Sequence, residues 1–307
     1  MTSPAIEIRH LTKTFGPVRA VDDLSFTVAP GRVTGFLGPN GAGKTTTLRM
    51  LLGLVSPTSG TATIGGKRYA ELERPLRTVG AALEASDFHP GRTARDHLRV
   101  SAPKAGATDA RVDELLDLVG LASAANRRVG GFSLGMRQRL GLAATLLGDP
   151  PVLLLDEPAN GLDPEGIRWL RDLLRRLAAE GRTVLVSSHV LAEVQQTVDD
   201  IVVISHGRLV HASTLPELVA LAEHRVRVST PDPAGLQALA AREGWTLTAG
   251  PEGSAELSGI TPAEVGHAAF AAGLELHQLA GVGGTLEDVF LRMTTEHPGT
   301  TTEGVAR

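Results

Sequence analysis

Apolar and polar positions alternate in short blocks over the first part of the chain. At residues 6–8 and 24–28 every second side chain is apolar, which predicts strands with one buried face. Residues 33–37, 152–155 and 183–186 are instead nearly continuous apolar runs, which are typical of strands covered on both faces. A sheet that contains such strands carries helices on both sides.

Helical patterns separate these strands. Residues 46–52 follow the first buried run and predict a helix. Strands that alternate with helices predict an α/β fold with a mostly parallel, doubly wound sheet, whose ligands bind at the carboxyl ends of the strands. Farther along the chain, one helical face is apolar and lies opposite arginines; its residues are Ile167, Leu170, Leu173, Leu174 and Leu177.

The pattern changes after residues 209–212. A strand, a helix, two short strands, a helix and a strand then follow one another, which is the order of a small ferredoxin-like α+β domain. These predicted elements are residues 225–229, 233–243, 246–248, 255–257, 262–272 and 274–279.

A last helix is predicted over residues 285–293, with Leu286, Val289, Phe290 and Met293 on its buried face. The remaining residues are rich in Gly, Thr and Pro, which is typical of a disordered tail. We therefore expect a nucleotide-binding domain at 1–215, an accessory α+β domain at 216–295 and a disordered tail at 296–307.

Composition fits a globular protein and excludes several kinds of site. The chain has 307 residues, 42% of them hydrophobic, which is enough for one large core and a smaller one. Its net charge of -4 and its scattered arginines form no basic surface, so we expect no nucleic-acid partner. It has no cysteine, which excludes disulfides, thiolate metal sites and cysteine nucleophiles, and which fits a reducing cytosol.

Nothing in the sequence predicts insertion into a membrane. The first residues lack the features of a secretion signal, and no apolar run approaches the length of about 20 residues that spans a bilayer. If the protein works at a membrane, we expect another chain to supply the membrane-spanning part.

The sequence GPNGAGKTT at residues 38–46 fits the phosphate-binding P-loop pattern G-x-x-x-x-G-K-[ST]. Its glycines allow backbone N–H groups to converge on phosphate oxygens at the start of a helix. We expect Lys44 to reach the β- and γ-phosphates and the Thr45 hydroxyl to ligate Mg²⁺. A glycine-rich turn without a ligand is the alternative. The predicted nucleotide-binding residues here are Gly38, Pro39, Asn40, Gly41, Ala42, Gly43, Lys44, Thr45 and Thr46.

Two adjacent carboxylates, Asp156 and Glu157, follow the apolar run at 152–155. Because side chains alternate along a strand, the two point in different directions and can take different roles. We expect Asp156 to hold Mg²⁺ opposite Thr45 and Glu157 to polarise the attacking water. Taken alone, a strand that ends in two acids is a weak motif, and surface acids are the alternative.

Five segments resemble, in order, the motifs of the ATP-binding subunits of ABC transporters. They are the P-loop at 38–46, a signature-like segment at 132–136, the acidic pair, a D-loop-like segment at 159–163 and the sequence Ser-Ser-His at 187–189. The resemblance covers residues 5–215. Many nucleotide hydrolases share the P-loop, but the signature segment is specific to this family.

This resemblance implies that the nucleotide is ATP, the metal is Mg²⁺ and the protein is a head-to-tail homodimer. Ser133 is a good helix N-cap and Gly135 allows close backbone approach, so this helix start can bind an anion. The implied anion is the γ-phosphate of ATP on the other subunit. By itself the segment would read as an ordinary capped helix.

The resemblance also assigns roles to two other side chains. It makes His189 a γ-phosphate sensor that positions water near the catalytic Glu157, although a histidine after a strand is more often structural. It places Phe15 where an aromatic ring stacks on adenine, with a core phenylalanine as the alternative.

The chain departs from the common family pattern at three places. Leu134 and Met136 stand where Gly and Gln are commoner, and Phe15 stands where Tyr is frequent. Glu84 aligns with a glutamine that usually serves Mg²⁺ and water. We expect the carboxylate of Glu84 to remain a metal ligand, because Mg²⁺ prefers oxygen.

Glu84, the Ser-Leu-Gly-Met form of the signature at 133–136 and the C-terminal domain that ends near residues 285–291 together look like the drug and antibiotic exporter branch of the family. The resemblance implies an ATPase that dimerises around two Mg-ATP molecules and drives a separate membrane permease, on the cytoplasmic face of the membrane. Arg92, Arg95 and His97 could line the permease contact, although a solvated loop is nearly as good an interpretation. Alternatives are a soluble ABC-type ATPase acting on ribosomes or DNA, and a P-loop kinase, which would leave the signature segment unexplained.

Overall fold

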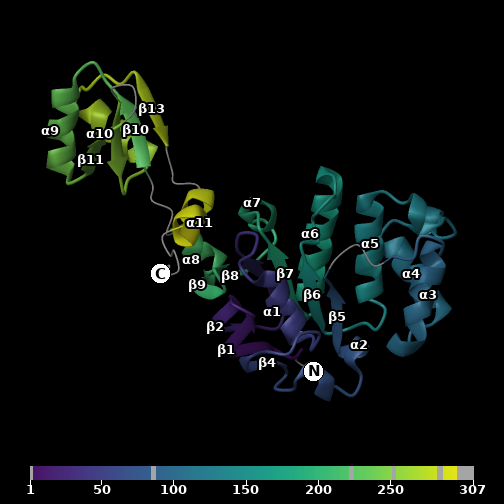
Figure 1. The fold of residues 1–307 in the computed structure, drawn as a ribbon. Coiled ribbons are helices and arrows are strands. Elements are labelled where there is room, and N and C mark those ends of the chain that lie inside the picture. The colour runs from purple at the N-terminus through teal and green to yellow at the C-terminus, as the bar shows by residue number, and fades with distance from the viewer. Residues whose placement is uncertain (1–2, 84–87, 221–224, 251–253, 282–285, 296–307) are drawn as a thin grey trace, which may run out of the picture. The chain divides into compact units, whose positions relative to one another are not determined.

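The computed structural model describes residues 3–83, 88–220, 225–250, 254–281 and 286–295. These residues form two compact units (Figure 1). One unit comprises the described residues up to Leu215 together with residues 293–295, and the other spans Pro216–Arg292. The final turn of the last helix therefore belongs to the first unit. The predicted tail at 296–307 lies outside the described residues.

A six-stranded sheet forms the centre of the first unit. Its strand order is β5-β6-β7-β3-β8-β9, and neighbouring strands run parallel except for β8 and β9. Every residue of β3, β6 and β7 is buried, which confirms the prediction from their continuous apolar runs. The strands are β3 (Val33–Leu37), β5 (Val79–Ala82), β6 (Val152–Asp156), β7 (Thr183–Ser188), β8 (Asp200–Ser205) and β9 (Arg208–Thr214).

A second sheet, antiparallel and in the order β2-β1-β4, lies against one side of the first. Its strands are β1 (Ile6–Phe15), β2 (Val18–Val28) and β4 (Ser59–Ile64). The two sheets share one hydrophobic core, in which the rings of Phe26 and Phe36 have centroids 5.2 Å apart. β1 and β2 are longer than their apolar patterns indicated and end in a hairpin turn.

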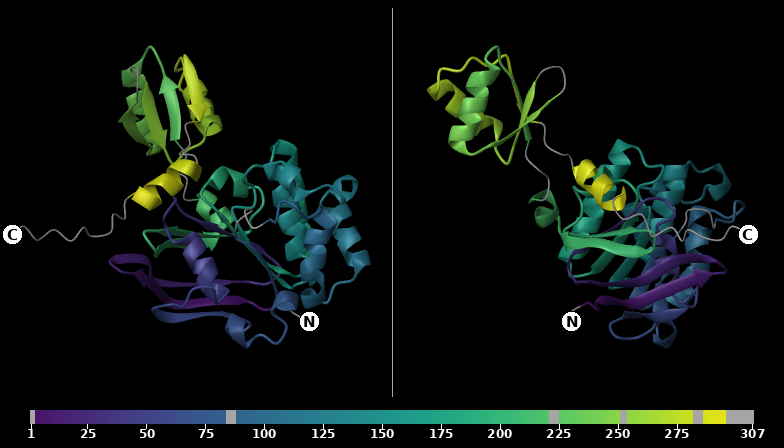
Figure 2. Two further views of the ribbon diagram at one scale, coloured as in Figure 1. Left: turned by 45° about the vertical axis from the view of Figure 1, so that its right-hand side comes forward. Right: turned by 60° about the vertical axis from the view of Figure 1, so that its left-hand side comes forward.

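Helices cover the central sheet. The helix α6 buries Leu170, Leu173, Leu174 and Leu177, as its apolar face predicts. Figures 1 and 2 show α3, α4 and α5 gathered into a helical subdomain beside α6. The helices are α1 (Lys44–Leu51), α2 (Pro75–Thr78), α3 (Ala94–Ala105), α4 (Asp109–Leu118), α5 (Leu134–Thr145), α6 (Pro164–Ala179) and α7 (Leu191–Val194). No helix among the described residues has the length and apolar character needed to cross a bilayer.

The second unit is an antiparallel sheet in the order β11-β12-β10-β13 with two helices, which confirms the ferredoxin-like order. β13 begins at Gln278, four residues later than expected, and Leu274 and Leu276, which precede it, pack against the small core. The elements are β10 (Arg225–Ser229), α9 (Pro233–Glu243), β11 (Thr246–Ala249), β12 (Ala255–Ser258), α10 (Pro262–Ala271) and β13 (Gln278–Gly281). The flanking helices are α8 (Leu215–Ala220) and α11 (Leu286–Thr295).

Candidate functional site

The P-loop connects the carboxyl end of β3 to the start of α1, as its sequence predicts. Gly43 is the N-cap of α1, with φ of 101°, and no side chain caps this helix. A Cβ atom on Gly43 would lie 2.4 Å from the carbonyl oxygen of Ala20, and one on Gly38 would lie 2.4 Å from that of Ile204. Both positions therefore require glycine. The uncapped start of α1 leaves backbone N–H groups for an anion.

Lys44 is buried beside this loop and beside the acidic pair. Its Nζ donates to the carbonyl oxygens of Gly38 at 2.7 Å and Pro39 at 3.4 Å, and it lies 3.5 Å from Oε1 of Glu157. Lys44 and Glu157 open onto one pocket, whereas Gly38 and Pro39, also predicted to bind the nucleotide, are not among its lining residues. Its lining consists of Phe15, Ala20, Asn40, Gly41, Ala42, Gly43, Lys44, Thr45, Thr46 and Glu157.

Asp156 joins the P-loop to the neighbouring strand β7. The Thr45 hydroxyl donates to Oδ2 of Asp156 at 2.6 Å, and the buried Ser187 hydroxyl donates to Oδ1. The register of β6 and β7 places Asp156 directly beside Ser187. Two hydrogen bonds therefore fix the orientation of this carboxylate.

Glu157 leaves the strand in a left-handed conformation, with φ of 49°. Its backbone N–H donates to the carbonyl oxygen of Ser187 at 3.2 Å and to the Ser187 Oγ at 3.1 Å. Its Oε2 lies 2.9 Å from Nδ1 of His189. His189 therefore contacts Glu157, which lines the P-loop pocket, and its expected role toward phosphate and water stays a prediction.

Phe15 lies at the β1–β2 hairpin and lines the same pocket. Its side chain is 49% exposed, so it is not a core phenylalanine. Nζ of Lys13 lies 4.8 Å from the centroid of the ring. Lys13 itself is not among the residues that line the pocket.

Ser133 and Gly135 lie at the start of α5. Ser133 is its N-cap, and the Ser133 side chain accepts a hydrogen bond from the N–H of Met136 at 3.2 Å. Neither residue lines the P-loop pocket of the same chain. Glu84, the third expected metal ligand, lies outside the described residues.

The residues suggested for a permease contact are partly engaged within the helical subdomain. Arg95 forms an ion pair with Asp113 at 2.8 Å, and the His97 ring packs against Phe88 with centroids 4.8 Å apart. Arg92 is exposed.

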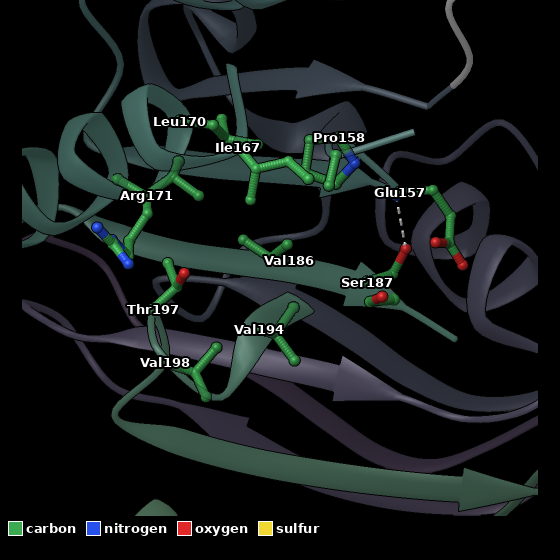
Figure 3. Close-up of a pocket in the computed structure, with 13 residues that line it drawn as sticks. Glu157, Pro158, Ile167, Leu170, Arg171, Val186, Ser187, Val194, Thr197 and Val198 are labelled. Carbon is green, nitrogen blue, oxygen red and sulfur yellow. Dashed lines mark hydrogen bonds between the residues drawn. The ribbon is translucent and has the colours of Figure 1, made fainter. Parts of the chain in front are cut away.

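An apolar pocket lies behind the acidic pair, between α6, β7 and α7 (Figure 3). Ile167, Val186 and Val194 converge there, and Glu157 and Ser187 lie at one end. Most of the lining side chains are apolar, and Arg171 and Thr197 also line this pocket.

Comparison with known proteins identifies the family of this site. The sequence profile described as "ABC transporter" matches residues 21–160. The bacitracin transport ATP-binding protein BcrA of Bacillus licheniformis is 46% identical over 210 residues, which cover 67% of this chain and 69% of the relative. The chain belongs to the ABC transporter family. It is an ATP-binding, ATP-hydrolysing member of that family.

Two further known proteins are similar to this chain over most of its length. The Nod factor export ATP-binding protein I of Paraburkholderia xenovorans is 37% identical over 303 residues, covering 96% of this chain and 98% of the relative. A solved structure described as the ATP binding subunit of an ABC transporter has a TM-score of 0.64 and 29% identity, and the match covers 70% of this chain and 92% of that chain. Residues 224–287 match a domain of unknown function, DUF8746.

Sequence reasoning missed the roles of Ser187 and Lys13 at this site. Ser187 belongs to the Ser-Ser-His segment, but its contact with Asp156 depends on strand register, which the segment does not reveal. Lys13 alternates with Phe15 on β1, so period-2 spacing could have placed both side chains on one face of the strand.

Proposed function

We propose that this chain is the ATP-hydrolysing subunit of an ABC exporter and that it acts as a homodimer around two Mg-ATP molecules. The convergence of Lys44, Thr45, Asp156 and Glu157 at one P-loop pocket carries this proposal. The four side chains come from two separate segments, and together they supply a cation, two metal-binding oxygens and a general base.

The site fits Mg²⁺ held jointly by protein and nucleotide. The Thr45 hydroxyl and the Asp156 carboxylate are hard oxygen donors that already lie together. Among the described residues, no group of three or more His, Asp or Glu side chains could hold a metal by itself. Phosphate oxygens and water would therefore complete the shell, which is the usual arrangement for Mg²⁺. The bound metal would neutralise charge on the phosphates.

The remaining chemistry belongs to the side chains. P-loop N–H groups and Lys44 bind the phosphates, and Phe15 stacks on the adenine. Glu157 accepts a proton from the attacking water. His189 holds the Glu157 carboxylate in place through the hydrogen bond between its Nδ1 and Oε2 of Glu157. The apolar pocket behind Glu157 limits the access of bulk water from that side.

The placement of Ser133 and Gly135 supports the homodimer. They form a capped helix start that lies apart from the pocket of their own chain. Such a start binds anions, so a second copy in head-to-tail arrangement would place it on the γ-phosphate.

The exporter role is supported by the relatives. Their names describe bacitracin transport and Nod factor export, so we propose a drug, an antibiotic or another amphipathic compound as the cargo. A separate permease would carry the cargo across the membrane, with this chain bound on its cytoplasmic face. The relatives favour this role over a soluble ATPase that acts on ribosomes or nucleic acid.

The variant Glu157→Gln tests the proposal. It should retain ATP, lose nearly all turnover and accumulate as an ATP-dependent dimer in size-exclusion chromatography, because the base is lost and the ligand contacts remain. Lys44→Ala in the same background is the control and should remain monomeric. A Glu157→Gln protein that stays monomeric at saturating Mg-ATP would contradict the shared site.

A further inference from the structure

The signature segment and the D-loop-like segment of one chain are in direct contact. Gly161 has φ of +76°, and a Cβ atom built on it would lie 2.2 Å from Cδ2 and 2.4 Å from Cγ of Leu134. A Cβ on Gly135 would lie 3.1 Å from the carbonyl oxygen of Gly161. Leu134 therefore packs on the bare backbone of Gly161 with no room for a methyl group between them.

The same segment is tied to Glu157. The N–H of Asn160 donates to the carbonyl oxygen of Glu157 at 3.1 Å, and the N–H of Leu162 donates to that of Ala159 at 3.1 Å. Glu157 is in turn held through its N–H by Ser187. A short, hydrogen-bonded stretch of backbone thus connects the residue under Leu134 to the general base.

Leu134 is not a core residue. Its side chain is 53% exposed although it covers Gly161, and it lies next to Ser133, the N-cap of α5. A leucine in this position contributes little apolar burial to the fold. What it does provide is a close contact between the start of α5 and the loop that follows Glu157.

We propose that Leu134 is a positioning residue through which the signature segment places Glu157 of the same chain. This inference rests on the proposed function, in which the start of α5 binds the γ-phosphate held by the other subunit. When the start of α5 binds that γ-phosphate, the position of Leu134 is fixed, and Leu134 in turn fixes the position of Gly161. The segment 157–161 then holds the Glu157 carboxylate in contact with the attacking water. Each subunit therefore hydrolyses its own ATP efficiently only when its signature segment has engaged the ATP of its partner.

A double-mutant cycle between Leu134 and Gly161 tests this contact. Gly161→Ala should lower kcat at least about tenfold, because the new methyl group displaces Leu134, and should leave the Kd for ATP within about twofold. Leu134→Ala should lower kcat severalfold and lower the Hill coefficient for ATP. The double variant should recover at least about fivefold in kcat over Gly161→Ala, because the smaller side chain makes room for the methyl group.

Matched controls separate this contact from general effects. Gly181 also has a positive φ, of +92°, and a Cβ built on it would meet nothing within 4 Å, so Gly181→Ala shows the effect of the backbone conformation alone. Leu54 is 67% exposed, and Leu54→Ala shows the effect of losing an exposed leucine. Both controls should keep wild-type kcat and Hill coefficient, and thermal melting checks that every variant folds.

The outcomes distinguish the inference from the proposed function. If the wild type hydrolyses ATP and Glu157→Gln dimerises, but the cycle is additive, the positioning role of Leu134 is wrong. If Leu134→Ala prevents the dimer in the Glu157→Gln background, Leu134 is a dimer contact and the role is also wrong. If the wild type has no ATPase activity and Glu157→Gln never dimerises, the proposed function itself fails.

Discussion

The Thr45 hydroxyl lies 2.6 Å from Oδ2 of Asp156, although the two residues are 111 positions apart in the chain. Removing this hydroxyl by Thr45→Val deletes one oxygen donor and leaves Oδ2 of Asp156 without its hydrogen-bond partner. We expect the Mg²⁺ concentration for half-maximal ATPase activity to rise about tenfold or more. Magnesium titrations at fixed ATP measure this.

Thr34→Val is the control for this variant. Thr34 is buried in β3, and its hydroxyl has no hydrogen-bond partner, so its removal should leave the magnesium dependence unchanged. An unchanged magnesium dependence in Thr45→Val as well would remove Thr45 from the metal site.

Ser187 orients both acids, since its hydroxyl donates to Asp156 and accepts from the N–H of Glu157. Ser187→Ala should therefore lower kcat about tenfold while the Kd for ATP changes less than about twofold. Steady-state kinetics and equilibrium nucleotide binding separate the two effects. Ser205→Ala, another buried serine at the end of a strand of this sheet, is the control. Equal losses in both variants would mean that Ser187 is merely structural.

Phe15 is exposed and lines the pocket, and among the described residues it is the one aromatic side chain of the lining. Phe15→Ala should raise the KM for ATP about tenfold with little change in kcat. The reason is that stacking on the adenine stabilises the bound substrate and the transition state equally, and both lose it. Phe15→Tyr should keep the wild-type KM. Val18→Ala, which changes the residue paired with Phe15 across the hairpin, should have no effect. A raised KM in the Tyr variant would argue against stacking.

Burial lowers the pKa of His97 below its ordinary value of 6.5, and Arg92 lowers this pKa further. The unfolded chain then binds a proton below about pH 6.5 that the folded chain resists, so stability falls as the pH drops from 6.5 toward the folded-state pKa. In His97→Gln this part of the pH dependence should disappear. Thermal melting between pH 7.5 and 5 measures it.

His206→Asn is the matched control for this experiment. His206 is exposed in the same unit and has a positive φ that asparagine tolerates, so the variant should keep the wild-type pH dependence. If His97→Gln kept it too, the titrating group would lie elsewhere.

Local patterns predicted those parts of the site that depend on local geometry. The P-loop needs only a strand, its glycines and a helix, and all three are visible in consecutive residues. The approach of Thr45 to Asp156 was also predictable, because the carboxyl ends of parallel strands meet at one edge of the sheet. The burial of β3, β6 and β7 was predictable for a different reason, because continuous apolar runs are typical of strands covered on both faces.

Features that depend on register or on distant contacts were not predictable. Ser187 reaches Asp156 only because β6 and β7 pair in one particular register. The positive φ of Glu157 is held by hydrogen bonds to β7, whereas Pro158 alone favours an extended backbone there. Similarly, Leu274 and Leu276 read as strand residues by their alternation, but the small core takes them up before β13 begins.

The chain leaves its nucleotide-binding unit at Leu215 and returns to it at Met293, and after the return the carbonyl of Thr294 accepts a hydrogen bond from Ser205. The accessory domain is thus anchored at both ends, like an insertion, rather than appended. Cutting the chain after Leu215 would consequently strip a buried strand end of its cover, whereas exchanging Pro216–Gly281 for a short linker would keep α11 whole and spare that contact. Any study of what the accessory domain contributes should use the second design.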